Sequence, residues 1–155
     1  ITESDNSATN MLMARLGSMT DINSALREWG LKHTYVQTWL PDLGGTNHST
    51  ARDMAQILYN IDNPKFLSNS SREKIFDYMG HVHNNRLIAA GLPTGATFLH
   101  KTGDIGKMLG DAGIVYAPNG KKYIVVIFAN RPHNSPLGKE FIVKASQTIY
   151  NNMVF

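Results

Sequence analysis

In the first half of the chain, apolar residues recur at helical spacing between polar and glycine-containing stretches. Helices are predicted over 7–16, which ends before a glycine, and over 21–29, where Thr20 can cap the first turn. A third helix is predicted after Thr50, because this capping hydroxyl precedes an amphipathic stretch. Residues 36–49 lack the periodicity and contain a proline and two glycines, which indicates a loop.

From residue 96 onward the apolar residues alternate, as they do in strands. Strands are predicted over 97–102, 112–117 and 123–129, and Pro-Asn-Gly at 118–120 predicts an antiparallel hairpin between the last two. Residues 137–152 then return to helical spacing. The stripe of this helix that should face the sheet consists of Phe141, Ala145, Thr148 and Ile149.

This order of elements predicts an α/β (α+β) fold, with an antiparallel sheet covered by a C-terminal helix. A helical subdomain at 1–95, containing an Ω-like loop at 36–49, would precede a sheet subdomain at 96–155, both within one domain. One closing helix covers a single face of a small sheet. We therefore expect a bare face and an open edge, which sequence before Ile1 would complete.

The composition excludes several classes of protein but does not identify the function. Apolar residues make up 42% of the chain and charged residues 17%, which excludes a disordered protein. The net charge of +3 is scattered, so no basic stripe for nucleic acid is present. Without cysteine there are no disulfides or thiolate nucleophiles, and no apolar run is long enough for a transmembrane helix. His81 and His83 lack a nearby carboxylate or cysteine, so no metal is expected.

Two tripeptides carry candidate chemistry, Ser-Asp-Asn at 4–6 before a helix and Lys-Thr-Gly at 101–103 on a strand. Each alone is a weak signal, since the first is also a common helix cap and the second an ordinary strand end. Their order, together with Trp-Leu-Pro-Asp-Leu at 39–43, Gly-Leu-Pro at 91–93 and the turn at 118–120, resembles the serine acyl-transferases that include class A β-lactamases and penicillin-binding proteins. The resemblance spans the chain and corresponds to the C-terminal part of that family's β-lactamase/transpeptidase-like domain.

The resemblance implies roles around one acyl centre. Ser4 would relay a proton to the departing amine, and the charge of Lys101 would hold that proton in place and attract a substrate carboxylate. Asn6 would fix a substrate amide, because its side chain both donates and accepts hydrogen bonds. Thr102 would hydrogen-bond the substrate carboxylate.

Further residues of the same site are implied at the strand end. Gly103 would let the edge strand approach the substrate backbone, and the backbone N–H of Asp104 would donate to the oxyanion. β-Lactamases often place an arginine after Lys-Thr-Gly or before it, where this sequence has Gly110 and Leu87. Arg86 is adjacent and can substitute as a substrate-binding residue, although a surface role is an equal alternative.

The family's nucleophilic serine lies in a Ser-x-x-Lys motif, which here matches only Ser71 to Lys74. This match follows Ser-Asp-Asn instead of preceding it, and its neighbours are charged. We interpret Ser70 or Ser71 as the cap of a fourth helix. The nucleophilic serine and its lysine are thus expected outside this chain, on a second polypeptide, unless the chain is an inactive fragment.

Leu40 occupies the position at which class A β-lactamases carry the glutamate that activates the deacylating water. Leucine cannot take up a proton, and Gly44 replaces the asparagine that helps hold that water. This resembles the class-A-like penicillin-binding proteins of the cyanobacterial penicillin-binding protein A group. The implied activity is that of a serine-type D-Ala-D-Ala carboxypeptidase or transpeptidase that penicillin acylates and water deacylates slowly.

The resemblance also implies the setting of the enzyme. The expected partners are peptidoglycan stem peptides, β-lactam antibiotics and the second polypeptide, with no nucleic acid and no cofactor. The expected location is the periplasm or the outer face of the cytoplasmic membrane. Two alternatives remain open: a class A-like β-lactamase with a relocated base, for which Asp42 is the only local carboxylate, and a non-catalytic peptidoglycan-binding relic.

Overall fold

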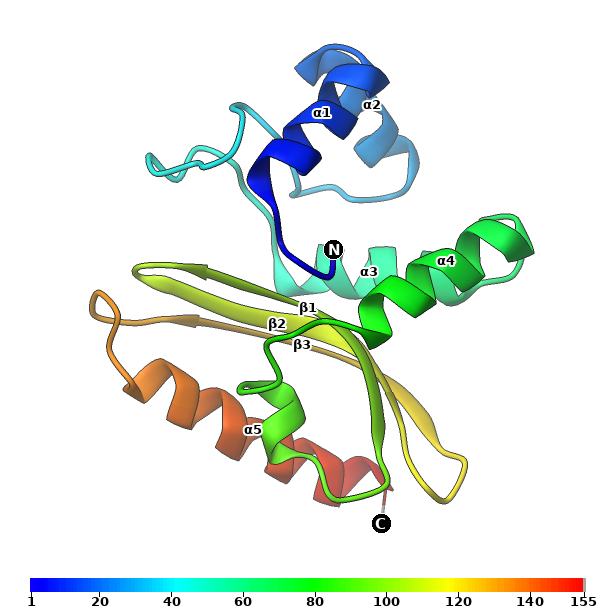
Figure 1. The fold of residues 1–155 in the computed structure, drawn as a ribbon, viewed down its shortest axis with the longest axis vertical. Coiled ribbons are helices and arrows are strands. Elements are labelled where there is room, and N and C mark those ends of the chain that lie inside the picture. The colour runs from blue at the N-terminus through cyan, green and yellow to red at the C-terminus, as the bar shows by residue number, and fades with distance from the viewer. Residues whose placement is uncertain (155) are drawn as a thin grey trace.

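The computed structural model describes residues 1–154 and places helices on both faces of an antiparallel sheet (Figure 1). The strands β1 (Thr97–Ile105), β2 (Met108–Tyr116) and β3 (Lys122–Asn130) lie side by side in that order. The expected α+β architecture is confirmed. The helices are α1 (Asn6–Leu16), α2 (Met19–Glu28), α3 (Ala51–Asp62), α4 (Asn69–Gly80), the short 3-10 helix η1 (Ile88–Gly91) and α5 (Leu137–Val154).

Side-chain caps begin helices α1 to α4, and two of them differ from the predicted caps. The Thr50 hydroxyl accepts the backbone N–H of Asp53 at the start of α3, as predicted. The α2 cap is Ser18 instead of Thr20, because Ser18 and Asp21 form a reciprocal capping box. The α4 cap is Ser68, two or three residues earlier than predicted.

The strands run further than their apolar alternation indicated. All three have nine residues, and the hairpin between β2 and β3 turns at Pro118-Asn119-Gly120 as predicted. Gly120 has a φ of +84°, a conformation that glycine adopts without steric cost. Within residues 1–154, β1 and β3 each pair only with β2, so both are edge strands.

Helix α5 and η1 pack on one face of the sheet (Figure 1). The predicted stripe of α5 was partly wrong, because Phe141 and Thr148 are exposed. Gly91 explains the difference, since a Cβ at this position would lie 2.5 Å from the carbonyl oxygen of Val143. Such close approach turns a different stripe inward. The buried positions of α5 are Gly138, Ile142, Ser146, Tyr150 and Val154.

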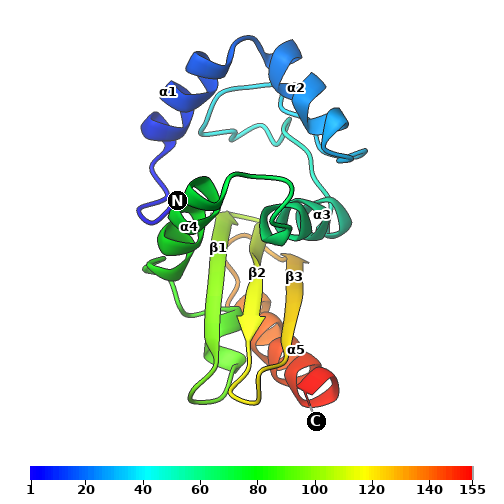
Figure 2. The same ribbon diagram turned by 90° about the vertical axis from the view of Figure 1, so that its right-hand side faces the viewer.

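Helices α3 and α4 cover the other face, which we had expected to be bare (Figure 2). Leu58 of α3 and Met79 of α4 form a second core with Ile114 of β2. The expectation was wrong because it assigned these helices to a separate helical layer. Their apolar faces instead serve as the second cover of the sheet.

Helices α1 and α2 lie beyond α3 and α4, away from the strands (Figure 2). Neither helix buries a residue, and Met11, Leu12 and Leu16 of α1 are among the exposed large apolar residues. The segment before α1 contacts α4, because the Thr2 hydroxyl donates to the carbonyl oxygen of Tyr78. None of the helices in residues 1–154 is both long and apolar enough to cross a lipid bilayer.

Candidate functional site

Ser4 lies in the extended segment that leads into α1. Its φ of +56° belongs to the left-handed region, a strain that costs about 1–3 kcal/mol for a residue other than glycine. The cap of α1 is the neighbouring Asp5, whose Oδ1 accepts the backbone N–H of Ala8 at 2.6 Å. Capping of the helix therefore leaves the Ser4 hydroxyl available for another contact.

Lys101 provides that contact from the middle of β1. Its Nζ donates to Oγ of Ser4 at 2.7 Å, although the two residues are 97 positions apart in the chain. The Nζ also donates to the carbonyl oxygen of Thr102. Burial lowers the pKa of Lys101, and the negative charge of Asp111 opposes that shift. The two motifs found in the sequence thus meet through a charged donor and a hydroxyl.

The strand end after Lys101 is an accessible edge. Gly103 is exposed, and a Cβ built on it would meet nothing within 4 Å. The next residue, Asp104, forms an ion pair with the largely buried Arg131, whose Nε also donates to the carbonyl oxygen of Gly106. This pair ties the end of β1 to the segment after β3 and fixes the backbone at the predicted oxyanion position.

The other predicted site residues are held by fewer contacts. Asn6 is exposed in the first turn of α1, two residues after Ser4, and Thr102 is half-buried beside Lys101. Arg86 is exposed in the segment between α4 and η1, next to the buried Leu87. Its backbone N–H donates to Oδ1 of Asn84, which fixes the main chain but leaves the orientation of the guanidinium unconstrained by that bond.

The loop at 36–49 is attached to α1 at Leu40. Asn10 holds the Leu40 main chain at two points, donating to its carbonyl oxygen at 2.7 Å and accepting its N–H at 2.9 Å. Asn10 lies one helical turn after Asn6, so both project from the same side of α1. Our sequence reasoning missed Asn10, although this spacing was a readable signal. The half-buried Leu40 is thereby held beside the helix that begins at the Ser-Asp-Asn motif.

Amides hold the rest of the loop as well. Asn23 of α2 binds the main chain of Val36 at two points, at 2.7 and 2.8 Å. Asn47 accepts the N–H groups of Gln37 and Thr38 and donates to the carbonyl oxygen of Thr38. Amide side chains from α2 and from the loop itself thus help to order this segment.

Asp42 is the only local carboxylate that the sequence offered as an alternative base. Its side chain forms hydrogen bonds within the loop itself. Its two oxygens accept the backbone N–H groups of Thr46 and Asn47 and the hydroxyl of Thr46. The backbone donors of Thr46 and Asn47 lower the pKa of Asp42. A carboxylate with these partners and a lowered pKa is a weak base toward a bound water.

The Ser-x-x-Lys match at Ser71 lies on an exposed part of α4. Ser71 is in the first helical turn, where its backbone N–H donates to Oγ of the cap residue Ser68. Both Ser71 and Lys74 are exposed, and the Ser71 hydroxyl accepts a hydrogen bond from the Ser68 hydroxyl at the start of the same helix. Ser71 is not the cap that we predicted, but its placement agrees with our exclusion of it as the nucleophile.

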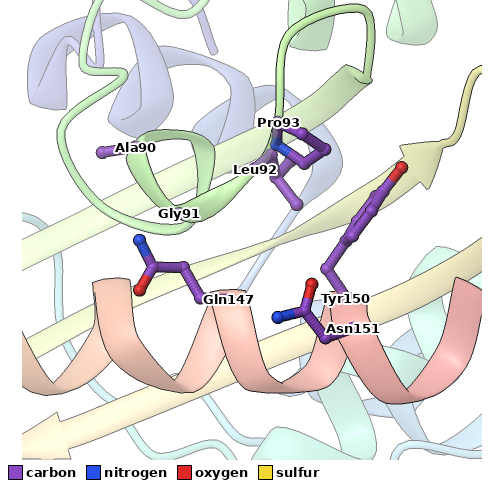
Figure 3. A pocket seen from close by; sticks show the side chains of 7 residues that line it. All are labelled: Ala90, Gly91, Leu92, Pro93, Gln147, Tyr150 and Asn151. Carbon is purple, nitrogen blue, oxygen red and sulfur yellow. The ribbon is translucent and has the colours of Figure 1, made fainter. Parts of the chain in front are cut away.

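A separate hollow of about 390 Å³ lies between η1 and α5 (Figure 3). The side chains of Leu92, Pro93 and Tyr150 line it together with the amides of Gln147 and Asn151. None of the residues predicted for the acyl-transfer site lines this hollow. It is therefore a feature of the α5 packing and not part of the Ser4–Lys101 site.

Comparison with known proteins agrees with the arrangement of these elements. The sequence model of the Beta-lactamase enzyme family matches residues 1–153. The structure of PBP-A is similar, with 44% sequence identity and a TM-score of 0.96 over 98% of this chain and 57% of that chain. A PBP-A variant in which glutamate replaces a leucine, solved as an acyl-enzyme complex with penicillin G, is 43% identical and also has a TM-score of 0.96, over 98% of this chain and 58% of that chain.

A sequence relative shows the same relationship. Beta-lactamase 3 of Bacillus cereus is 30% identical over 136 residues, which cover 82% of this chain and 43% of the relative. The chain thus spans about half the length of the proteins it matches. The resemblance inferred from the sequence motifs is confirmed, and the α+β fold is the one these relatives share. On the match over residues 1–153, this chain belongs to the β-lactamase enzyme family.

Proposed function

We propose that this chain is the C-terminal part of a serine acyl-transferase that acts on D-Ala-D-Ala peptides of peptidoglycan and that penicillin acylates. The observation that supports this proposal is the 2.7 Å hydrogen bond from Nζ of Lys101 to Oγ of Ser4. A lysine charge beside a hydroxyl can hold a relay proton and stabilise negative charge in the same place. A strand end or a helix cap alone would not require these two side chains to meet.

In this proposal the two motifs divide the work of acyl transfer. Ser4 passes a proton to the departing amine, and Lys101 keeps that hydroxyl oriented and attracts the substrate carboxylate. Thr102 and Arg86 bind the same carboxylate. The exposed backbone at Gly103 accepts an extended peptide along the edge of β1, as edge strands do with unpaired backbone groups.

The amide of Asn6 binds a substrate carbonyl from the start of α1. The backbone N–H of Asp104 donates to the oxyanion, with the Arg131 ion pair holding the backbone there. The N–H must lie where the negative charge of the oxyanion develops, not where the ground-state carbonyl oxygen lies. Its fixed position therefore contributes directly to the rate.

The loop supports slow deacylation. Asn10 fixes the main chain of Leu40 beside α1, and an apolar side chain at this place supplies no general base for water. Acylation by penicillin is supported by a similar protein, a PBP-A variant in which glutamate replaces a leucine, which was solved as an acyl-enzyme complex with penicillin G. Penicillin traps an enzyme whose penicilloyl ester water hydrolyses slowly. On the peptide substrate, an amine acceptor can attack the peptidyl ester instead of water and so complete transpeptidation.

A β-lactamase is the second candidate, favoured by the sequence relative from Bacillus cereus. This function needs a base beside the ester. Asp42 is poorly suited, because its oxygens are occupied by the loop backbone and its pKa is lowered. The hydrogen bonds of Asp42 therefore favour the penicillin-binding function over the β-lactamase function.

The nucleophilic serine and its lysine belong, in this proposal, to the family's Ser-x-x-Lys motif, which lies outside these 155 residues. The assembled enzyme works without a cofactor in the periplasm or at the outer face of the cytoplasmic membrane, where stem peptides are found. We use "assembled enzyme" below for these residues together with the part of the enzyme that carries the motif.

Labelled penicillin tests the proposal on the assembled enzyme. A stable covalent adduct supports the penicillin-binding function, rapid turnover supports the β-lactamase, and no adduct supports a non-catalytic relic. Lys101→Met should slow adduct formation by about 10² or more, a typical loss for one electrostatic group of an acyl-transfer site. The matched control is Lys107→Met, because Lys107 is an exposed lysine on the turn that follows β1. Equal rates for the two variants would refute the role of Lys101.

A further inference from the structure

The strand that carries Lys101 ends in a carboxylate of its own. Asp104 directly follows the Lys-Thr-Gly motif, and its side chain is 53% exposed. Consecutive strand residues point to opposite faces, so Thr102 and Asp104 project from the same face of β1, roughly 7 Å apart along the strand. In the proposed function Thr102 binds a substrate carboxylate. A negative charge this close to that position repels such a substrate unless another group cancels it.

Arg131 supplies the opposite charge from the segment after β3. Its Nη2 donates to Oδ1 of Asp104, although only 7% of the Arg131 side chain is exposed. Nε donates to the carbonyl oxygen of Gly106 at 3.1 Å, and Nη1 donates to the carbonyl oxygen of Ser135 at 3.4 Å. All three guanidinium nitrogens therefore have acceptors. A planar group held at three nitrogens has little freedom to turn away from the carboxylate.

The start of α5 leaves room for the arginine at one glycine. A Cβ at the buried Gly138 would lie 2.8 Å from Cδ of Arg131 and 3.4 Å from its Cβ. The aliphatic part of Arg131 thus packs against α5, while its charged end binds the end of β1. A guanidinium with this little exposure is costly without partners, so the Asp104 carboxylate and the two carbonyl oxygens are what keep it in place.

Backbone hydrogen bonds hold the same segment against the turn between β1 and β2. The backbone N–H of Arg131 donates to the carbonyl oxygen of Lys107 at 2.7 Å. The carbonyl oxygen of Gly106 accepts the backbone N–H of Asn134 at 3.0 Å in addition to the Arg131 Nε. These bonds keep the strand end that carries Asp104 beside the guanidinium.

The two cations at this strand have separate partners. Nζ of Lys101 donates to the Ser4 hydroxyl, whereas the guanidinium of Arg131 binds the Asp104 carboxylate. With Arg131 in place, the strand end presents the charge of Lys101 to a substrate carboxylate, because the charge of Asp104 is cancelled. Without Arg131, the carboxylate of Asp104 would oppose the attraction that Lys101 provides.

We propose that Arg131 is a positioning residue that determines substrate specificity: by neutralising Asp104 it allows the end of β1 to bind a substrate with a free carboxylate. The inference rests on the proposed function, in which Lys101 and Thr102 bind that carboxylate. Arg131 acts through Asp104 and makes no contact with the substrate. Two unit charges roughly 7 Å apart at a partly exposed site change a rate constant about three- to tenfold.

Penicillin G and its methyl ester test this inference on the assembled enzyme, because they share the lactam ring and differ in the carboxylate charge. The quantity measured is the ratio of their second-order acylation rate constants, acid over ester. Arg131→Met should lower this ratio about three- to tenfold, since an uncompensated Asp104 repels only the acid. Arg131→Lys should retain most of the ratio, because it keeps the positive charge.

Arg72→Met is the matched control. Arg72 is also a partly buried arginine that donates to a main-chain carbonyl, but it lies on α4 and binds the carbonyl oxygen of Asp62. Its replacement removes the same charge and should leave the ratio of acid to ester unchanged. An equal shift in Arg72→Met would attribute the effect to the net charge of the protein and overturn the inference.

Asp104→Asn keeps the test independent of the folding of Arg131→Met. It removes the carboxylate and leaves the guanidinium, so the ratio should rise above the wild-type value. The double variant Arg131→Met/Asp104→Asn should return the ratio close to that of the wild type. A purely structural role of Arg131 would lower both rate constants equally.

Three results overturn the inference: an unchanged ratio in folded Arg131→Met, a ratio that does not rise in Asp104→Asn, and a double variant whose ratio is no higher than that of Arg131→Met. Absence of acylation in the wild type with both compounds would instead overturn the proposed function, and this inference with it.

Discussion

Replacement of Leu40 by glutamate should convert slow deacylation into faster penicillin hydrolysis. The substitution adds a general base at a point whose main chain is already fixed, because both hydrogen bonds from Asn10 use backbone atoms of Leu40 and survive the change. A well-placed general base is worth roughly 10² to 10⁴ in rate. We expect a gain of about 10 to 10², because Gly44 offers no side chain to hold the water.

The structure also sets the cost of Leu40→Glu. Leu40 is half-buried, so loss of its apolar contacts should reduce the free energy of unfolding by about 1 kcal/mol. Trp39 and Leu43 are 45% and 83% exposed, which leaves the new carboxylate partly hydrated. Its pKa should therefore rise, but less than in a sealed apolar pocket. The rate gain should be present above that pKa and fade below it, because only the ionised form accepts a proton.

The assay is release of penicilloate from a preformed adduct, followed by intact mass across a range of pH. Leu40→Gln is the matched control, since glutamine has the same shape but cannot accept a proton as a base. We expect glutamate to accelerate release and glutamine to leave it unchanged. Equal release rates for Leu40→Glu and the wild type at every pH would show that residue 40 does not face the ester, and equal gains for both variants would attribute the effect to loop loosening.

Three further outcomes test the packing. Thr50→Ala should lower the free energy of unfolding by about 1 kcal/mol in urea denaturation through loss of the α3 cap, whereas Thr20→Ala, which removes no cap, should change it little. Gly91→Ala should cost about 1–3 kcal/mol, because its Cβ would lie 2.5 Å from the Val143 carbonyl oxygen; a stability equal to wild type would contradict the close approach of η1 and α5. Burial raises the pKa of Tyr123 to about 12, so its neutral phenol contributes stability that is complete below about pH 10 and lost as pH rises toward 12; melting temperatures across this range should show that loss in the wild type and less of it in Tyr123→Phe.

Much of the local structure could be predicted because neighbouring residues determine it. The Thr50 cap and the turn at 118–120 depend on side chains within four residues of the backbone they serve, and both were predicted. The pairing of Ser4 with Lys101 was expected only through the family resemblance. No local rule joins residues 97 positions apart.

Predictions that needed spatial neighbours were less successful. The stripe of α5 was misplaced because its inward face depends on how closely Gly91 lets η1 approach. The second cover of the sheet was missed because an amphipathic helix shows that it has a partner but not which one. In both cases the helix does bury an apolar face, but the tertiary packing decided which residues form that face or which element it contacts.

The sequence by itself determined the helices with their capping hydroxyls, the hairpin, the two motifs and the apolar residue at position 40. Only the tertiary structure decided the hydrogen bonds that make these features a site, because each joins elements whose order in the chain does not reveal their contact. Asn10 binds the main chain of Leu40, Arg131 pairs with Asp104, and Asp111 accepts the backbone N–H of Ile88. Polar contacts of this kind depend on ångström-scale placement, which the packing of two apolar cores on one sheet supplies.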